Sequence, residues 1–188
     1  MSIFKINDQN EIYYEFTEPK GNGHTFVFVN ALTGNTTAWN GIIGDKITED
    51  RNGFLTYNFR GQDNSKFSEE LNLDTDLIVS DLCLLIENLK LKDIILVGLS
   101  IGGLYASLAL EKGVKSKGLV LINTLRKNNS RLKWINETMV NVARYGGTSL
   151  LMDMNMPVIA SPSFLDKMKP NALLSLIHIS EPTRLSVI

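Results

Sequence analysis

The feature that most constrains this chain is a short apolar run that ends abruptly in Gly-x-Ser-x-Gly, from Gly98 to Gly102. Residues 94–97, Ile-Ile-Leu-Val, precede the motif, and a helical pattern follows it directly over residues 101–111. An apolar run of this length is typical of a strand that is buried on both faces of a sheet. The five letters alone are weak evidence, because glycine is a common residue. The buried strand before the motif and the helix after it are what make it informative.

In that context the motif predicts a nucleophile elbow, a sharp strand-to-helix turn with Ser100 at its apex. The turn would hold Ser100 in a strained backbone conformation, with its hydroxyl clear of the sheet. Side chains at Gly98 and Gly102 would collide across so tight a turn, so glycine is expected at both positions. The alternative is an ordinary glycine-rich turn in which the serine caps the helix over residues 101–111.

Composition describes an ordinary globular protein: 188 residues, 44% hydrophobic and 21% charged, with a formal net charge of −1. Neither end carries a basic stripe, so we expect no nucleic-acid partner and no membrane surface. The single cysteine, Cys83, excludes an internal disulfide and is consistent with a reducing compartment. Residues 1–8 lack the apolar segment of a signal peptide, and no run is long enough to span a bilayer. These features predict a cytoplasmic location.

Short β-like runs alternate with longer helical patterns, which predicts an α/β domain with a mostly parallel sheet and flanking helices. The first two runs, divided by a polar stretch, are expected to form an antiparallel hairpin. The expected strands cover residues 2–6, 11–17, 25–29, 53–57, the run before the elbow, and 119–122, the last of these as a buried strand. The expected helices cover residues 39–47, 74–89, 101–111, 132–145 and 163–169.

Two further motifs stand at the ends of expected strands. Residues 28–34, Phe-Val-Asn-Ala-Leu-Thr-Gly, end the third strand, and residues 57–65, Tyr-Asn-Phe-Arg-Gly-Gln-Asp-Asn-Ser, end the fourth. With the elbow, and in this order along the chain, they resemble the α/β-hydrolase fold superfamily. The resemblance covers roughly residues 11–125.

The resemblance implies a serine hydrolase in which Ser100 attacks a carbonyl carbon and two backbone N–H groups stabilise the oxyanion. These donors would be the N–H groups of Leu32 and Ile101. Relatives usually carry His-Gly where this chain has Asn30-Ala31. Both donors belong to the main chain, so this departure need not remove them.

The third motif resembles the superfamily's Asp-x-Arg-Gly-x-Gly-x-Ser loop, with Asn58 and Asp63 as departures. We expect Arg60 to brace this loop by bonding to nearby carbonyls, with a role in substrate binding as the alternative. Three methionines after residue 126, at positions 152, 154 and 156, either line an adaptable acyl pocket or serve ordinary packing.

A serine nucleophile needs a base within hydrogen-bond reach, and the base needs a carboxylate. In the superfamily the order along the chain is serine, acid, histidine. His24 precedes Ser100 and is therefore expected to be a surface histidine, which leaves only His178. No convincing strand followed by an acid lies between Ile122 and His178; residues 157–159 are the nearest candidate.

Residues 174–184, Leu-Ser-Leu-Ile-His-Ile-Ser-Glu-Pro-Thr-Arg, resemble the translation of a common transposase adapter used to build sequencing libraries. One choice of codons reproduces that adapter without interruption. We therefore expect the genuine reading frame to end near Leu173 and residues 174–188 to be a non-native tail. The alternative is a natural tail in which His178 is the catalytic histidine.

These observations predict the N-terminal part of an α/β-hydrolase core in residues 1–125 and a partial helical cap in residues 126–173. The expected function is acyl transfer from a small ester or lactone through Ser100, with the chain inactive as written because the acid and the histidine are missing. No cofactor and no metal are expected, since the sequence has no ligand cluster and no phosphate-binding glycine loop. The alternative is a non-catalytic relative that binds a small molecule.

Overall fold

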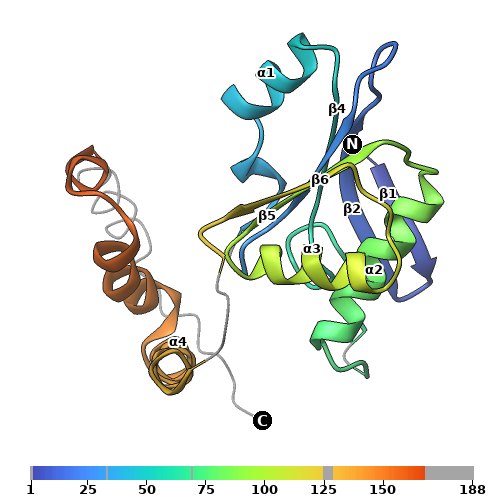
Figure 1. Cartoon of the computed structure of the whole chain (residues 1–188). Coiled ribbons are helices and arrows are strands. Elements are labelled where there is room, and N and C mark those ends of the chain that lie inside the picture. The colour runs from blue at the N-terminus through green and yellow to red at the C-terminus, as the bar shows by residue number, and fades with distance from the viewer. Residues whose placement is uncertain (1, 33, 69, 125–128, 168–188) are drawn as a thin grey trace. The chain divides into compact units, whose positions relative to one another are not determined.

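The computed structural model describes residues 2–32, 34–68, 70–124 and 129–167. The chain divides into two compact units, Met1–Lys127 and Asn128–Ile188. The first unit contains a six-stranded sheet with helices packed against it, and the described part of the second is helical (Figure 1).

The sheet has the strand order β1-β2-β4-β3-β5-β6. β1 pairs antiparallel with β2, and β2 pairs antiparallel with β4. β4, β3, β5 and β6 are parallel to one another. The predicted hairpin and the mostly parallel sheet are therefore confirmed. The strands are β1 (Ser2–Asn7), β2 (Asn10–Thr17), β3 (Thr25–Val29), β4 (Gly53–Tyr57), β5 (Ile94–Leu99) and β6 (Gly118–Ile122).

The helices of the first unit are a short 3-10 helix (Thr36–Ala38), α1 (Ile42–Glu49), α2 (Thr75–Asn88) and α3 (Ile101–Glu111). α2 begins where its capping residue predicts, because the Asp74 carboxylate accepts a hydrogen bond of 2.9 Å from the Leu77 N–H. The helix predicted over residues 39–47 begins later. Gly41, with φ +71°, interrupts the chain between Trp39 and α1, and the apolar pattern did not show this break.

β3 is buried on both faces of the sheet. Its successive side chains point to opposite faces, as in any strand. Val27 and Val29 lie in the larger core cluster, which includes side chains of α2 and α3. Phe28 lies in a smaller cluster on the other face, with ring centroids 4.6 Å from Trp39 and 5.0 Å from Phe54. The continuous apolar sequence of β3 reflects this burial on both sides.

β6 differs from the buried strand that its sequence predicts. Val120, Leu121 and Ile122 are 44%, 50% and 40% exposed. β6 stands at the end of the strand order and, within the described residues, pairs only with β5. Its exposure therefore follows from its position at the sheet's edge, where an apolar strand favours aggregation.

The second unit contains α4 (Ser130–Ile159), which begins at an Asn129 cap and bends sharply at Gly147, where φ is +72°. The segment of α4 before Gly147 agrees with the helix predicted over residues 132–145, and a second segment continues from the bend to Ile159. Residues 157–159, considered above as a strand, form its last turn. Residues 162–167 are helical, in agreement with the helix predicted from residue 163.

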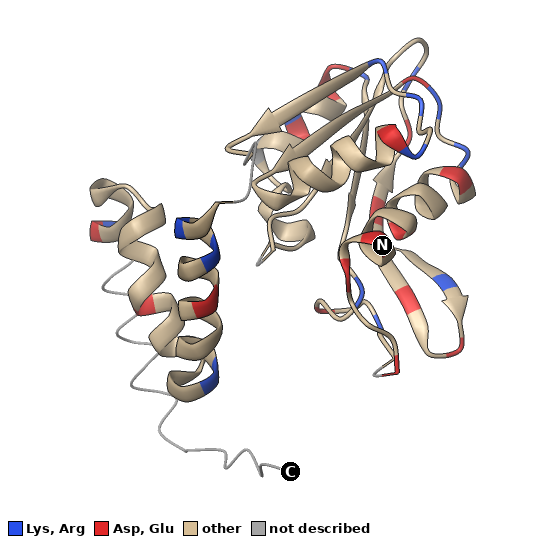
Figure 2. Ribbon diagram, turned by 60° about the horizontal axis from the view of Figure 1, so that its bottom comes forward, with Lys and Arg blue, Asp and Glu red and all other residues tan. Residues whose placement is uncertain are grey.

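Charged residues of both signs are scattered over the first unit (Figure 2). Several form exposed ion pairs, such as Lys117 with Asp93, whose Nζ and Oδ1 atoms lie 3.2 Å apart. Such pairs contribute little to stability, because both charges remain solvated. Of the helices that the structure describes, none combines the length and the apolar character that a membrane crossing would require.

Candidate active site

Ser100 lies at the abrupt turn between β5 and α3. Its backbone angles are φ +55° and ψ −122°, a region that residues other than glycine rarely adopt. Its N–H donates a hydrogen bond of 2.9 Å to the carbonyl of Ile122 at the end of β6. The Ser100 side chain is half-buried and makes no capping hydrogen bond to α3, contrary to the reading in which this serine is a helix cap.

Close backbone packing around this turn explains its glycines. A Cβ atom at Gly98 would overlap the backbone of Gly103, and one at Gly102 would overlap the carbonyl oxygens of Val29 and Asn30. The first turn of α3 therefore packs directly against the ends of β3 and β5. No side chain fits at position 98 or 102 without a shift of the backbone.

The loop that contains Leu32 and the Ser100 turn stand at the same edge of the sheet, because β3 and β5 are parallel neighbours. Val29, the last residue of β3, is in register with Gly98 of β5. Leu32 follows three residues later and is 63% exposed. Ile101 is the first residue of α3, so its N–H has no acceptor within the helix.

Asn30, which stands where relatives carry histidine, is fully buried and uses both ends of its amide. Its Nδ2 donates to the carbonyl oxygen of Tyr57 over 2.7 Å, and its Oδ1 accepts from the indole Nε1 of Trp39 over 2.6 Å. Asn30 thereby joins the ends of β3 and β4 to a core aromatic residue. In the sequence only Trp39 indicated this link, because a buried indole N–H needs a hydrogen-bond acceptor.

Three more hydrogen bonds join the loop after β3 to the loop after β4. The Thr36 N–H donates to Asn58 Oδ1 (2.8 Å), Gln62 Nε2 donates to the Leu32 carbonyl (2.8 Å), and Asn35 Nδ2 donates to Asp63 Oδ2 (2.6 Å). Both departures in the third motif, at positions 58 and 63, thus supply side-chain acceptors for the neighbouring loop.

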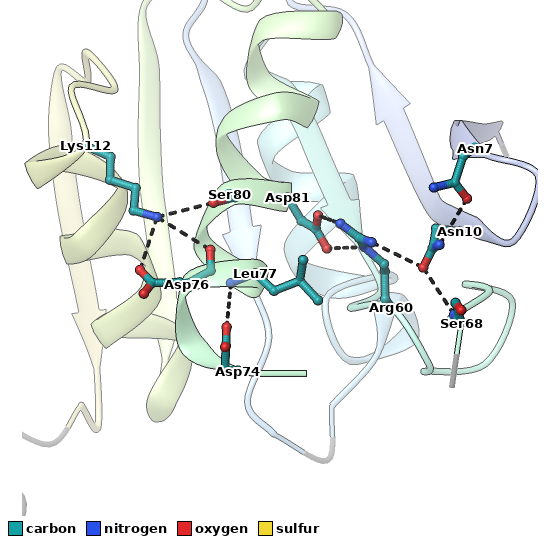
Figure 3. Close-up of polar contacts among 10 residues, drawn as sticks. All are labelled: Asn7, Asn10, Arg60, Ser68, Asp74, Asp76, Leu77, Ser80, Asp81 and Lys112. Atoms are coloured by element: carbon teal, nitrogen blue, oxygen red, sulfur yellow. Dashed lines mark hydrogen bonds and ion pairs between the residues drawn. The ribbon is translucent and has the colours of Figure 1, made fainter. Parts of the chain in front are cut away.

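Arg60 is buried and braces the structure beneath these loops (Figure 3). Its Nε donates to Asp81 Oδ2 over 2.7 Å, its Nη2 pairs with Asp81 Oδ1, and its Nη1 donates to Asn10 Oδ1 over 3.2 Å. The expected brace is confirmed, but its partners are a carboxylate of α2 and a side-chain amide of β2. A buried guanidinium requires a counter-charge, which backbone carbonyls cannot provide.

The carboxylate of this pair is perturbed by its surroundings. Burial raises the pKa of the Asp81 carboxyl above its usual value, while the hydrogen bond and the charge of Arg60 act in the opposite direction. Arg60 is buried, and each of its three guanidinium nitrogens contacts Asp81 or Asn10. These contacts support the brace rather than a role in substrate binding.

His24, the histidine that the structure describes, lies at the edge of the sheet opposite Ser100. His24 immediately precedes β3, and its Nδ1 lies 3.3 Å from the carbonyl oxygen of Asp93, just before β5. Both positions are at the amino edge of the parallel strands, opposite Ser100. His178 lies outside the described residues. Within the described ranges, no three His, Cys, Asp or Glu side chains gather as a metal site would require.

The methionines of the second unit differ in their surroundings. Met154 lines a cavity of about 240 Å³ between the two halves of α4, together with apolar residues such as Trp134 and Val158. Met152 is 52% exposed, and Met154 itself is 51% exposed. Both belong to the unit Asn128–Ile188.

Comparisons with known proteins agree with this architecture. A family model described as "alpha/beta hydrolase fold" matches residues 24–154. A search of curated proteins found no match. Among solved structures, the chain is similar to MGS-M2, an alpha/beta hydrolase enzyme from a Medee basin deep-sea metagenome library. The identity is 25% and the TM-score 0.81, over 94% of this chain and 65% of that one.

Two structures with lower identity share the fold. One is an esterase from Exiguobacterium antarcticum, with 16% identity and a TM-score of 0.71 over 92% of this chain and 67% of that one. The other is the enol-lactonase from Burkholderia xenovorans, with 21% identity and a TM-score of 0.71 over 89% and 63%. The chain thus spans about two thirds of the length of these structures. Since the family model matches well over half of the chain, this protein belongs to the α/β-hydrolase fold family.

Proposed function

We propose that this chain carries the nucleophile and the oxyanion donors of a serine hydrolase that cleaves a small ester or lactone. The observation that carries the proposal is the strained backbone of Ser100, between β5 and α3 at the carboxyl edge of the sheet. Strain at a single serine is retained where it aims the hydroxyl at a substrate. The esterase and lactonase among the similar structures support the substrate class.

In this proposal the Ser100 Oγ attacks the carbonyl carbon, and the carbonyl oxygen becomes an oxyanion. The N–H groups of Leu32 and Ile101 stabilise that oxyanion, each by about 3 kcal/mol. The positive end of the α3 dipole acts in the same direction. The Oγ–H proton passes to a base. As the oxyanion collapses, the bond from the carbonyl carbon to the leaving oxygen breaks and that oxygen takes up the proton. Water then attacks the acyl carbon and restores the Ser100 hydroxyl.

The proton must pass through a base, and His24 lies at the opposite edge of the sheet. We therefore propose that the described residues contain no base for Ser100 and give no triad-dependent turnover on their own. Loss of the base lowers kcat by about a million-fold in a well-studied serine hydrolase.

A fluorophosphonate probe tests the proposal, with imidazole added as an external base. We expect one adduct per chain, located at Ser100 by peptide mass spectrometry, and no adduct in Ser100→Ala. An intact chain that is not labelled at Ser100 even with imidazole would favour the alternative, a non-catalytic binding protein. The structural use of Asn30, in place of the relatives' histidine, is the observation that favours this alternative.

A further inference from the structure

The loop that carries Leu32 is held by a side chain from a different loop. We propose that Gln62 is a positioning residue, which fixes the Leu32 backbone so that its N–H can serve the oxyanion. This inference rests on the proposed function and assigns a role to a residue at a variable position of the third motif.

Gln62 uses both ends of its side-chain amide. Its Oε1 accepts a hydrogen bond of 3.0 Å from the Phe59 N–H, and its Nε2 donates one of 2.8 Å to the Leu32 carbonyl. Leu32 itself is 63% exposed, so apolar packing does not hold it in place. The hydrogen bond from Gln62 is therefore the contact that fixes the carbonyl side of Leu32.

The amide side of Leu32 is fixed separately. The carbonyl of Ala31, which belongs to the same peptide group as the Leu32 N–H, accepts a hydrogen bond of 3.0 Å from the Gly34 N–H. With both flanking peptide groups bonded, the direction of the Leu32 N–H is determined. Of the two bonds, only the one from Gln62 is made by a side chain and can be removed by substitution without changing the loop's own sequence.

A positioning residue must itself be held, and Gln62 is. The Ser65 N–H donates to the Gln62 carbonyl over 2.8 Å. The buried Ser65 Oγ donates to the Asn58 carbonyl over 3.0 Å and accepts from the Tyr13 N–H of β2 over 2.9 Å. These bonds hold the loop after β4 against the sheet, so Gln62 binds the Leu32 carbonyl from a position that is itself fixed. Preorganised donors of this kind depend on such support.

Three variants separate the tether from general effects on the loop. Gln62→Ala removes both hydrogen bonds. Gln62→Glu keeps the shape and the acceptor for Phe59, but its carboxylate cannot donate to the Leu32 carbonyl. The control is Asn64→Ala, since Asn64 lies in the same loop, is exposed, and makes no side-chain hydrogen bond within the described part of the chain.

The first measurement is ¹⁵N relaxation of the Leu32 amide in the full chain, which does not depend on activity. We expect an order parameter near that of rigid backbone, about 0.85, in the original chain and in Asn64→Ala. In both Gln62 variants it should fall below about 0.6. Thermal melting of each variant checks that the sheet remains folded.

The second measurement is the rate of Ser100 labelling by the fluorophosphonate probe in the presence of imidazole. In both Gln62 variants we expect the maximal rate constant to fall by about tenfold, with the half-saturating probe concentration unchanged. An interaction that forms only in the transition state changes the first quantity and not the second. Asn64→Ala should match the original chain in both.

The outcomes are distinct. The inference is overturned if Leu32 remains ordered in both Gln62 variants, if Leu32 loses order without a fall in the maximal rate, or if Asn64→Ala shows the same losses. A change in the half-saturating concentration alone would indicate a contact with the bound probe, and also overturns it. If the original chain is never labelled, the proposed function fails and the positioning role fails with it, even where relaxation confirms the tether.

Discussion

The turn at Ser100 and the loop at Leu32 meet at one edge of the sheet, yet the fold holds them by different means. The Ser100 turn is held by backbone packing so close that Gly98 and Gly102 cannot carry a side chain. The Leu32 loop is held by side-chain hydrogen bonds from Asn30, Asn58 and Gln62. The Ser100 turn therefore cannot accept added atoms at its glycines, whereas the Leu32 loop is sensitive to the loss of polar side chains.

The largest effect on stability is expected for the buried pair of Arg60 and Asp81. Asp81→Asn removes the counter-charge of the buried Arg60 and should destabilise the chain by about 3–5 kcal/mol in urea unfolding. Asp76→Asn is the matched control, because Asp76 is 90% exposed in its pair with Lys112 (Figure 3). It should cost less than about 0.5 kcal/mol. Equal effects of the two changes would contradict the role assigned to burial.

The Ser100 turn should respond to a single added methyl group. Gly102→Ala places a Cβ against the carbonyl oxygens of Val29 and Asn30, so we expect a loss of about 3 kcal/mol in the same unfolding measurement. Gly118→Ala in β6 is the control, because its Cβ would make ordinary contacts at 3.8 Å with Ile95. If Gly102→Ala were as stable as the control, close packing would not be what requires this glycine.

The Leu32 loop should instead respond to a lost amide. Asn30→Ala leaves the Trp39 indole N–H and the Tyr57 carbonyl buried without a partner, and should cost about 2 kcal/mol. The fluorescence of Trp39 should change with it, because its hydrogen bond is lost. A fully stable Asn30→Ala chain with unchanged fluorescence would contradict the description of this loop as held by polar contacts.

The smallest effect on stability is expected at Gln62, where a substitution should instead slow the labelling of Ser100. Gln62 is only partly buried, so Gln62→Ala should lower the free energy of unfolding by about 0.5 kcal/mol. The tenfold loss expected in labelling of Ser100 would then exceed what instability explains. A loss of several kcal/mol would make Gln62 a structural residue of the first unit.

The difference between the Ser100 turn and the Leu32 loop also explains which features could be predicted from the sequence. The Ser100 turn was predictable because its signals are contiguous: an apolar strand, two glycines and a helix within a short segment. The side-chain pairs that hold the loops after β3 and β4 were not, since Arg60 and Asp81 lie 21 residues apart and Asn30 and Trp39 nine. Nothing local marks one as the partner of the other.

Two further differences arise from context rather than from the sequence of the element itself. The apolar sequence of β6 predicts burial, but its exposure depends on whether another strand lies beside it. The start of α1 was displaced because Gly41 adopts a positive φ, which an apolar pattern does not reveal. The assignment of Ser100, Leu32 and Ile101 to catalysis stays a prediction that only chemistry can test.

The role of Ser100 as the nucleophile is tested by the rate of its phosphonylation as a function of imidazole concentration. We expect a rate near background without imidazole, a steady rise as imidazole is added, and no labelling in Ser100→Ala at any concentration. Rapid labelling without imidazole, lost in His178→Ala, would show that the chain already contains its base. No labelling of Ser100 at any imidazole concentration would contradict its assignment as the nucleophile.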